Sequence, residues 1–88
     1  MSWTIEIKPS AEKQYLQLDK QARTRIKDAL YALKAAEIPL RRDGVRALTG
    51  PLKGDYRMRV GRWRILFSPD MESKVLQNYA ILPRSKAY

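Results

Sequence analysis

The chain has 88 residues, and its 18 Lys and Arg against 9 Asp and Glu give a formal net charge of +9. It contains no Cys and no His, which excludes disulfide frameworks, Cys-based zinc sites and enzymes that depend on a thiolate or an imidazole. The length fits one small domain, residues 1–88, and the apolar fraction of 44% suffices for one modest core.

A strand and two helices are predicted for the first half of the chain. Residues 3–8 alternate apolar and polar side chains, which is the period of a half-buried strand. Pro9 suits the first turn of a helix, and Asp19 can cap the N-terminus of a second helix, which ends at Ile38-Pro39. The apolar residues of these helices follow helical spacing: Ala11, Tyr15 and Leu18 in the first, then Ala22, Ile26, Ala29, Leu30 and Leu33 in the second.

Three strands are predicted for the second half, after a Gly- and Pro-rich loop over residues 39–54. Residues 55–60 and 62–67 alternate apolar and polar side chains around Gly61, which predicts a β-hairpin. Ser68-Pro69-Asp70 is predicted as a turn, and residues 75–82 as a last, central strand that ends at Pro83. The fold class is therefore α+β, in the order β-α-α-β-β-β, with a helical hairpin packed on a small, mainly antiparallel sheet.

Positive charge is concentrated in this second half, because residues 41–88 carry a net +7 and residues 1–40 only +2. Arg57 and Arg59 lie on one face of their predicted strand, about 7 Å apart, and Arg62 and Arg64 form a second pair on the next strand. Like charges on adjacent strands destabilise a sheet, whereas guanidinium groups bind phosphate in a bidentate manner and stack on bases. We interpret this face as a site for a polyanion; the alternative is a solvated face that discourages edge-to-edge aggregation.

Two further candidates, Arg84 and Tyr88, follow the last strand. Pro83 can direct this short segment onto the basic face, where the ring of Tyr88 would stack on a base; otherwise such a segment is usually frayed. The other aromatic residues of the hairpin and the last strand are expected in the core: Tyr56, Trp63 and Tyr79.

The stretch from Leu48 to Phe67, with Tyr56-Arg57-Met58-Arg59-Val60-Gly61 at its centre, resembles the RelE/ParE superfamily of bacterial toxin–antitoxin toxins. That superfamily shows a leucine-glycine loop, a Tyr-Arg-x-Arg-Val strand, a glycine turn and an aromatic-Arg-Ile/Val-x-Tyr/Phe strand. The ending Pro83-Arg84-Ser85-Lys86-Ala87-Tyr88 is similar to its closing basic segment with a terminal tyrosine. The predicted element order matches as well, so the resemblance covers essentially the whole chain.

The resemblance implies a type II toxin of the RelE branch: a ribosome-dependent, metal-independent endoribonuclease (mRNA interferase) without a cofactor. Such a toxin cuts messenger RNA in the ribosomal A site by attack of the 2′-hydroxyl and so inhibits translation. It also implies a cognate antitoxin, with which the toxin can form a hetero-oligomer. The catalytic residues of the family fall on Arg57, Arg59, Arg64, Arg84 and Tyr88. Neighbouring cations are expected to bind the RNA: Lys53, Arg62 and Lys86.

The arginines limit the chemistry that such a site can perform. Guanidinium groups stabilise the negative charge of a phosphorane transition state, and alignment of the 2′-hydroxyl with the leaving oxygen supplies a further part of the rate. Arginine is a poor base because it stays protonated. Tyr88 and Lys53 are therefore the candidates for proton transfer.

Two other functions fit the sequence. The ParE branch shares the fold but inhibits DNA gyrase and cleaves no RNA, although its members generally lack the arginine-plus-tyrosine set. A non-catalytic basic nucleic-acid-binding domain also fits the charge and the fold. We recognise no signal peptide and no apolar run of roughly 20 residues, so a cytoplasmic protein with no membrane partner is expected.

Overall fold

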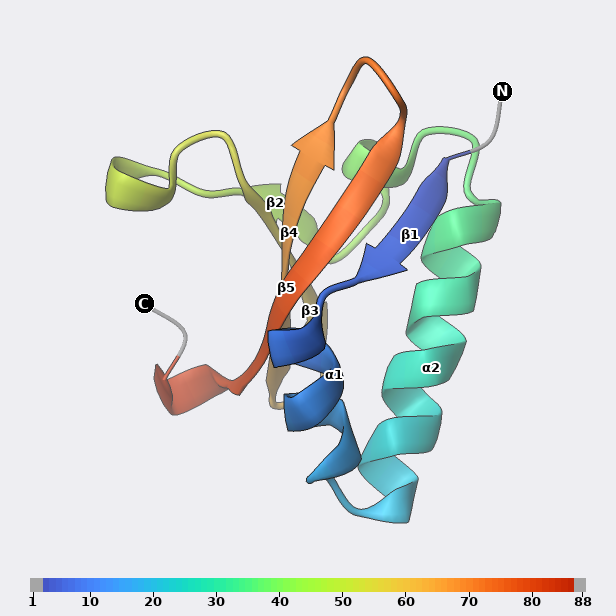
Figure 1. Cartoon of the computed structure of the whole chain (residues 1–88), viewed down its shortest axis with the longest axis vertical. Coiled ribbons are helices and arrows are strands. Elements are labelled where there is room, and N and C mark those ends of the chain that lie inside the picture. Colours follow the sequence, from blue (N-terminus) through green and yellow to red (C-terminus); the bar gives the residue numbers. More distant parts are fainter. Residues whose placement is uncertain (1–2, 87–88) are drawn as a thin grey trace.

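The computed structural model describes residues 3–86, which form a five-stranded sheet with two helices on one face (Figure 1). The helices are α1 (Pro9–Leu16) and α2 (Lys20–Ala35), and short 3₁₀ turns lie at Pro39–Arg41, Gly50–Leu52 and Arg84–Lys86. The strands are β1 (Thr4–Ile7), β2 (Val45–Ala47), β3 (Tyr56–Val60), β4 (Trp63–Asp70) and β5 (Val75–Pro83). The predicted α+β class, with its helical hairpin on a mainly antiparallel sheet, is confirmed.

The strands lie in the order β1-β5-β4-β3-β2. β1 runs parallel to β5, and the other neighbours are antiparallel. β5 is therefore an interior strand, as predicted, while β1 and β2 form the two edges of the sheet.

Local signals in the sequence determine where the helices begin. Pro9 occupies the first turn of α1, where its missing N–H would have no partner in any case. Asp19 caps α2, because its Oδ1 accepts a hydrogen bond from the N–H of Ala22 at 2.8 Å. The predicted apolar stripe of α2 faces the sheet, with Ile26 and Leu33 almost fully buried. The core lies between the two helices and the facing side of the sheet.

The loop prediction over residues 39–54 was wrong in part, because it contains the edge strand β2. This strand pairs with β3 from Val45 opposite Met58 to Ala47 opposite Tyr56. Three residues are too few for a period of two to stand out in the sequence, so the interval was predicted as loop.

The predicted turn at Ser68-Pro69-Asp70 was also wrong, since these residues are the end of β4 and pair with β5. Pro69 is tolerated because β3 stops pairing with β4 at Phe67, which leaves the end of β4 as an edge. The chain reverses one residue later. Asp70 Oδ1 accepts hydrogen bonds from the N–H groups of Glu72 and Ser73, both at 3.1 Å, which is the typical role of Asp in a turn.

A β-bulge interrupts the ladder between β4 and β5. Leu66 lies opposite Ala80 and Phe67 opposite Asn78, so Tyr79 has no partner residue on β4. The fully buried Asn78 fills this irregularity, because its Nδ2 donates to the carbonyls of Leu66 at 2.9 Å and Ala80 at 3.1 Å. The extra residue changes the direction of the following side chain.

Candidate phosphate-binding face

The face of the sheet opposite the helices, which we call the outer face, carries the predicted arginines. Met58 on β3 and Ile65 on β4 belong to the core, so the alternation of a strand places Arg57, Arg59 and Arg64 on the outer face. In Figure 1, α1 and α2 lie together on one side, whereas the turn at Gly50–Leu52 and the C-terminal turn extend away from them. Neither α1 nor α2 covers the arginines.

Strand register groups these arginines into two pairs. Arg59 lies directly opposite Arg64 across β3 and β4, and Arg57 lies directly opposite Arg46 across β2 and β3. Side chains in such positions have Cβ atoms about 4.5–5.5 Å apart, and like charges there destabilise the sheet. Arg46 was missed as a site residue because the strand that carries it was not predicted.

Most of these charges have no partner in the described part of the chain. Within residues 3–86, the side chains of Arg46, Arg57, Arg59 and Arg84 form no hydrogen bond or ion pair. Arg57 is half-buried and the other three are exposed. The outer face therefore presents cations whose charge an external anion can neutralise.

Arg64 differs from its neighbours because it also braces the β3–β4 turn. Its Nη1 donates to the carbonyls of Gly61 and Trp63, both at 3.0 Å, and only 9% of the residue is exposed. Gly61 has φ of 58° and is the first residue of the two-residue turn. A residue with a side chain is strained in this left-handed region, so glycine suits the turn, and Arg64 bonds to the carbonyls on either side of Arg62.

Arg84 lies at the same end of the outer face as this turn. Its N–H donates to the carbonyl of Arg62 at 2.7 Å, which ties the start of the C-terminal turn to the β3–β4 turn. The Arg62 guanidinium stacks over the ring of Trp63, with its Cζ 5.3 Å from the ring centroid. A shallow hollow between the two turns is lined by Arg62, Trp63, Pro83, Arg84 and Ser85. Arg62 and Arg84 thus lie together. The prediction that Arg62 and Arg64 form a pair on one strand was wrong, because β4 begins at Trp63 and Arg62 belongs to the turn.

Lys53 is an exposed residue directly after the turn at Gly50–Leu52. We call Arg57, Arg59 and Arg64 the arginine row. Lys53 precedes β3, Arg62 follows it, and Arg84 is tied to Arg62, so the predicted cations lie at both ends of this row. Lys86 belongs to the C-terminal turn, but its side chain lies outside the described part of the structure. All of Tyr88 lies outside the described residues as well.

One carboxylate, that of Asp55, lies at the start of the arginine row. Asp55 precedes Arg57 by two positions, and its Oδ2 accepts a hydrogen bond from the hydroxyl of Tyr79 at 2.8 Å. Burial, together with this hydrogen bond to a carboxylate, raises the pKa of Tyr79 above its ordinary value of 10.0, so its hydroxyl remains a donor. The prediction of Tyr79 as a core residue was wrong, because the bulge directs its hydroxyl to Asp55.

Solved structures with the same architecture are toxins of the RelE and YoeB type. The RelE–RelB complex from Pyrococcus horikoshii OT3 contains a chain 26% identical to this one, with a TM-score of 0.77 over 99% of this chain and 100% of that chain. The chain therefore has a RelE-like fold. A mutant of E. coli RelE in the free state gives 19% identity and a TM-score of 0.75 over 99% and 87% of the two chains. The YoeB/ParE toxin from Agrobacterium tumefaciens is 16% identical in sequence, with a TM-score of 0.74 over 91% of this chain and 96% of that chain.

The resemblance predicted from the arginine motif is thus confirmed at the level of the whole fold. No protein-family model matches the sequence, and the comparison with curated proteins found no match. Among the described residues of this RelE-like chain, no three acidic side chains form a group that could hold a metal ion. None of the described helices is long and apolar enough to span a membrane.

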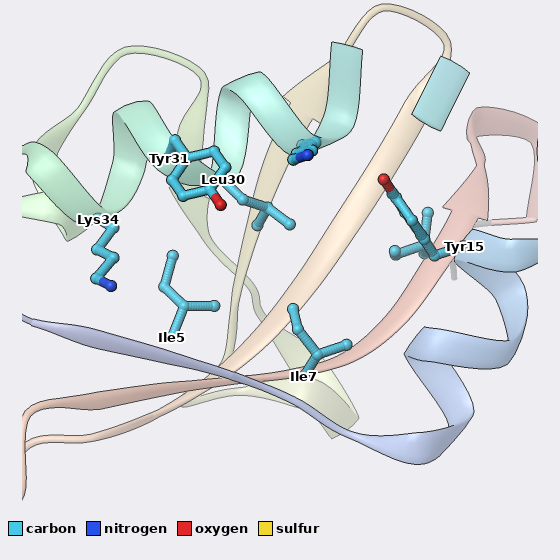
Figure 2. Close-up of a pocket in the computed structure, with 8 residues that line it drawn as sticks. Ile5, Ile7, Tyr15, Leu30, Tyr31 and Lys34 are labelled. Atoms are coloured by element: carbon cyan, nitrogen blue, oxygen red, sulfur yellow. The ribbon is translucent and has the colours of Figure 1, made fainter. Parts of the chain in front are cut away.

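A second concave surface of the RelE-like chain lies on the helical side, between α2 and the edge strand β1. Figure 2 shows Ile5 and Ile7 of β1 pointing toward Leu30 and Tyr31 of α2, with Tyr15 of α1 at one end. The groove has a volume of about 280 Å³, and Lys27 and Lys34 complete its lining together with Ile81. Tyr31 is 62% exposed, so apolar surface remains open to a partner.

Proposed function

We propose that this RelE-like chain is the toxin of a type II toxin–antitoxin system and cuts messenger RNA on the ribosome. The observation that carries the proposal is the arginine row of the outer face. Arg57, Arg59 and Arg64 are adjacent by strand register, and the charges of Arg57 and Arg59 have no partner within residues 3–86. A single-stranded RNA backbone supplies regularly spaced anions that match such a row.

The proposed reaction is an internal transesterification. The 2′-hydroxyl oxygen attacks the adjacent phosphorus while the bond from phosphorus to the 5′-oxygen breaks. The products are a 2′,3′-cyclic phosphate and a 5′-hydroxyl, so one proton leaves the attacking oxygen and one joins the leaving oxygen. Arg59, Arg64 and Arg84 would stabilise the charge on the phosphorane, and Arg57 would bind the RNA backbone beside them. Lys53 and Tyr88 are the candidates for proton transfer.

Dependence on the ribosome follows from the weakness of this acid–base set. A positioned general acid or base typically contributes about 10²–10⁴-fold, and the chain has no His to supply one. We propose that the ribosome supplies the missing part by holding the message with its 2′-hydroxyl in line with the leaving oxygen. This site of action would place the protein in the cytoplasm.

An antitoxin partner is supported by a different surface, the apolar groove between α2 and β1. The P. horikoshii RelE and the Staphylococcus aureus YoeB were both solved in complexes, with RelB and YefM respectively. Apolar side chains next to Lys27 and Lys34 suit an amphipathic segment that carries acidic residues. We propose that such a segment of the antitoxin folds into this groove. Tyr31→Asp should then weaken the complex at least tenfold in a titration, whereas Lys13→Gln should leave it unchanged.

The test of the nuclease proposal uses purified ribosomes that carry a defined message, with the 5′ ends of the fragments mapped after the protein is added. Cleavage is expected in the A site, and free RNA should be cut poorly. Arg59→Gln and Arg84→Gln should each slow cleavage at least about tenfold, as expected for the loss of a transition-state donor. The matched control is Lys13→Gln, which removes one positive charge from the exposed side of α1.

Two results would contradict the nuclease proposal. If translation continues on uncut message while DNA gyrase loses its supercoiling activity, the chain acts as a ParE-type inhibitor. If neither process changes while RNA is bound, it is a non-catalytic nucleic-acid-binding domain.

A further inference from the structure

We infer that Arg46 and Arg57 form a second phosphate subsite, which holds the phosphodiester next to the scissile one. The inference rests on the proposed function, because it describes how the same RNA lies on the outer face. Arg46 and Arg57 are directly opposite each other on β2 and β3. They line a hollow whose other wall is the segment from Ala47 to Leu52. Its volume of about 560 Å³ is within the range of sites that bind small ligands.

The charges of this hollow favour an anion. Neither guanidinium group has a hydrogen bond or ion pair within residues 3–86, and Arg57 is half-buried, so solvent screens its charge less than at a fully exposed site. The nearby carboxylate of Asp55 accepts a hydrogen bond from the Tyr79 hydroxyl and forms no ion pair with either arginine. Two guanidinium groups on neighbouring strands can donate together to the non-bridging oxygens of one phosphate.

Hydrogen bonds within the chain hold the wall of the hollow in place. The N–H of Leu48 donates to the carbonyl of Asp55 at 2.9 Å, and the N–H of Asp55 donates to the carbonyl of Leu52 at 3.0 Å. The N–H of Lys53 donates to the carbonyl of Gly50 at 3.0 Å, and the Asp55 side chain is tied to β5 through Tyr79. The wall of the subsite is therefore held by bonds within the chain itself, and such ordering lowers the entropy lost on binding.

The spacing of the two arginine pairs explains why they would hold adjacent phosphates. Arg59 and Arg64 form one pair, and Arg46 and Arg57 form the other, two residues away along β3. Two residues of a strand span about 7 Å, a step comparable to one nucleotide of an extended RNA chain. We place the scissile phosphate at Arg59 and Arg64 because they lie nearer to Arg84.

The subsite is tested by binding rather than by cleavage. A short single-stranded RNA with 2′-O-methyl groups throughout cannot undergo the attack, so its affinity for the free protein reports contacts alone. Arg46→Gln should reduce the slope of log affinity against log salt concentration by about 0.7, the value for one lost phosphate contact on a single strand. Arg46→Lys should keep the slope of the unchanged protein. Lys13→Gln, the matched control on α1, should keep it as well.

A scan of the same RNA locates the contact. When each phosphate is replaced in turn by an uncharged methylphosphonate, the unchanged protein should lose affinity at two adjacent positions. For Arg46→Gln, the replacement should no longer lower the affinity at one of these positions but should still lower it at the other. For Arg59→Gln, the two positions should exchange these roles. The inference is overturned if Arg46→Gln gives the same slope and the same scan as the unchanged protein, or if the unchanged protein does not bind the RNA at low salt.

The outcome separates this inference from the nuclease proposal. If the protein cleaves RNA on the ribosome but the methylphosphonate scan is the same for Arg46→Gln and the unchanged protein, only the subsite is rejected. If affinity falls at two adjacent phosphates but no RNA is cleaved on the ribosome, the subsite is supported and the nuclease proposal is rejected.

Discussion

Replacing Asn78 by Leu should lower the free energy of unfolding by about 1–3 kcal/mol, because the β-bulge that this residue fills would lose its internal donor. The Asn78 amide donates to the carbonyls of Leu66 and Ala80, and the residue is fully buried. Each buried polar group left without a partner costs about 1–3 kcal/mol. Part of that cost is offset, because Leu also removes the buried Oδ1 of Asn78, which has no partner among the described residues.

Urea denaturation followed by tryptophan fluorescence measures this change. The midpoint should fall while the dependence on urea concentration stays the same, and each kcal/mol should lower the thermal midpoint by about 4–8 °C for a chain of this length. Gln77→Leu is the matched control, since Gln77 makes no side-chain hydrogen bond within residues 3–86. If Asn78→Leu is as stable as the unchanged protein, the two carbonyls do not depend on the amide and the reasoning is refuted.

Tyr79→Phe should cost about 1–2 kcal/mol by removing the donor to Asp55. Because the pKa of Tyr79 is raised on folding, this stabilisation is complete below pH 10 and is lost as the pH rises further; parallel pH profiles of unfolding for the two proteins would contradict it. Gly61→Ala should cost about 1–2 kcal/mol, since φ of 58° suits glycine, and a urea midpoint within error of the unchanged protein would disprove the strain. Asp19→Ala should cost about 1 kcal/mol through the lost cap of α2, measured by circular dichroism against Asp28→Ala, a change within the same helix.

Features that depend on a few neighbouring residues were predictable from the sequence. Pro9 and Asp19 mark the starts of the helices, because both act through backbone groups within one turn. The common face of Arg57 and Arg59 was predictable too, since alternation along a single strand requires no knowledge of its partners. The shared face of these two arginines therefore needed only the sequence, whereas their role stays a prediction.

Features that depend on register between distant segments were not predictable. Arg46 is a single arginine in a three-residue strand, and only its pairing with Arg57 makes it part of the outer face. Tyr79 lies in an apolar strand and was assigned to the core, because a bulge leaves no local mark in the sequence. The Asn78 amide that fills the bulge bonds to Leu66, 12 residues away.

Arg64 shows why a motif alone cannot separate catalysis from stability. Its guanidinium group is a member of the arginine row and also braces the turn at Gly61. A loss of cleavage in Arg64→Ala therefore has two possible sources, the missing charge and a loosened hairpin. Arg59 lies directly opposite, is exposed and has no side-chain partner within residues 3–86, so Arg59→Gln changes the charge without removing such a brace. If cleavage falls in Arg59→Gln at an unchanged urea midpoint, the charge of the outer face is what the reaction requires, and any larger loss in Arg64→Ala measures the brace.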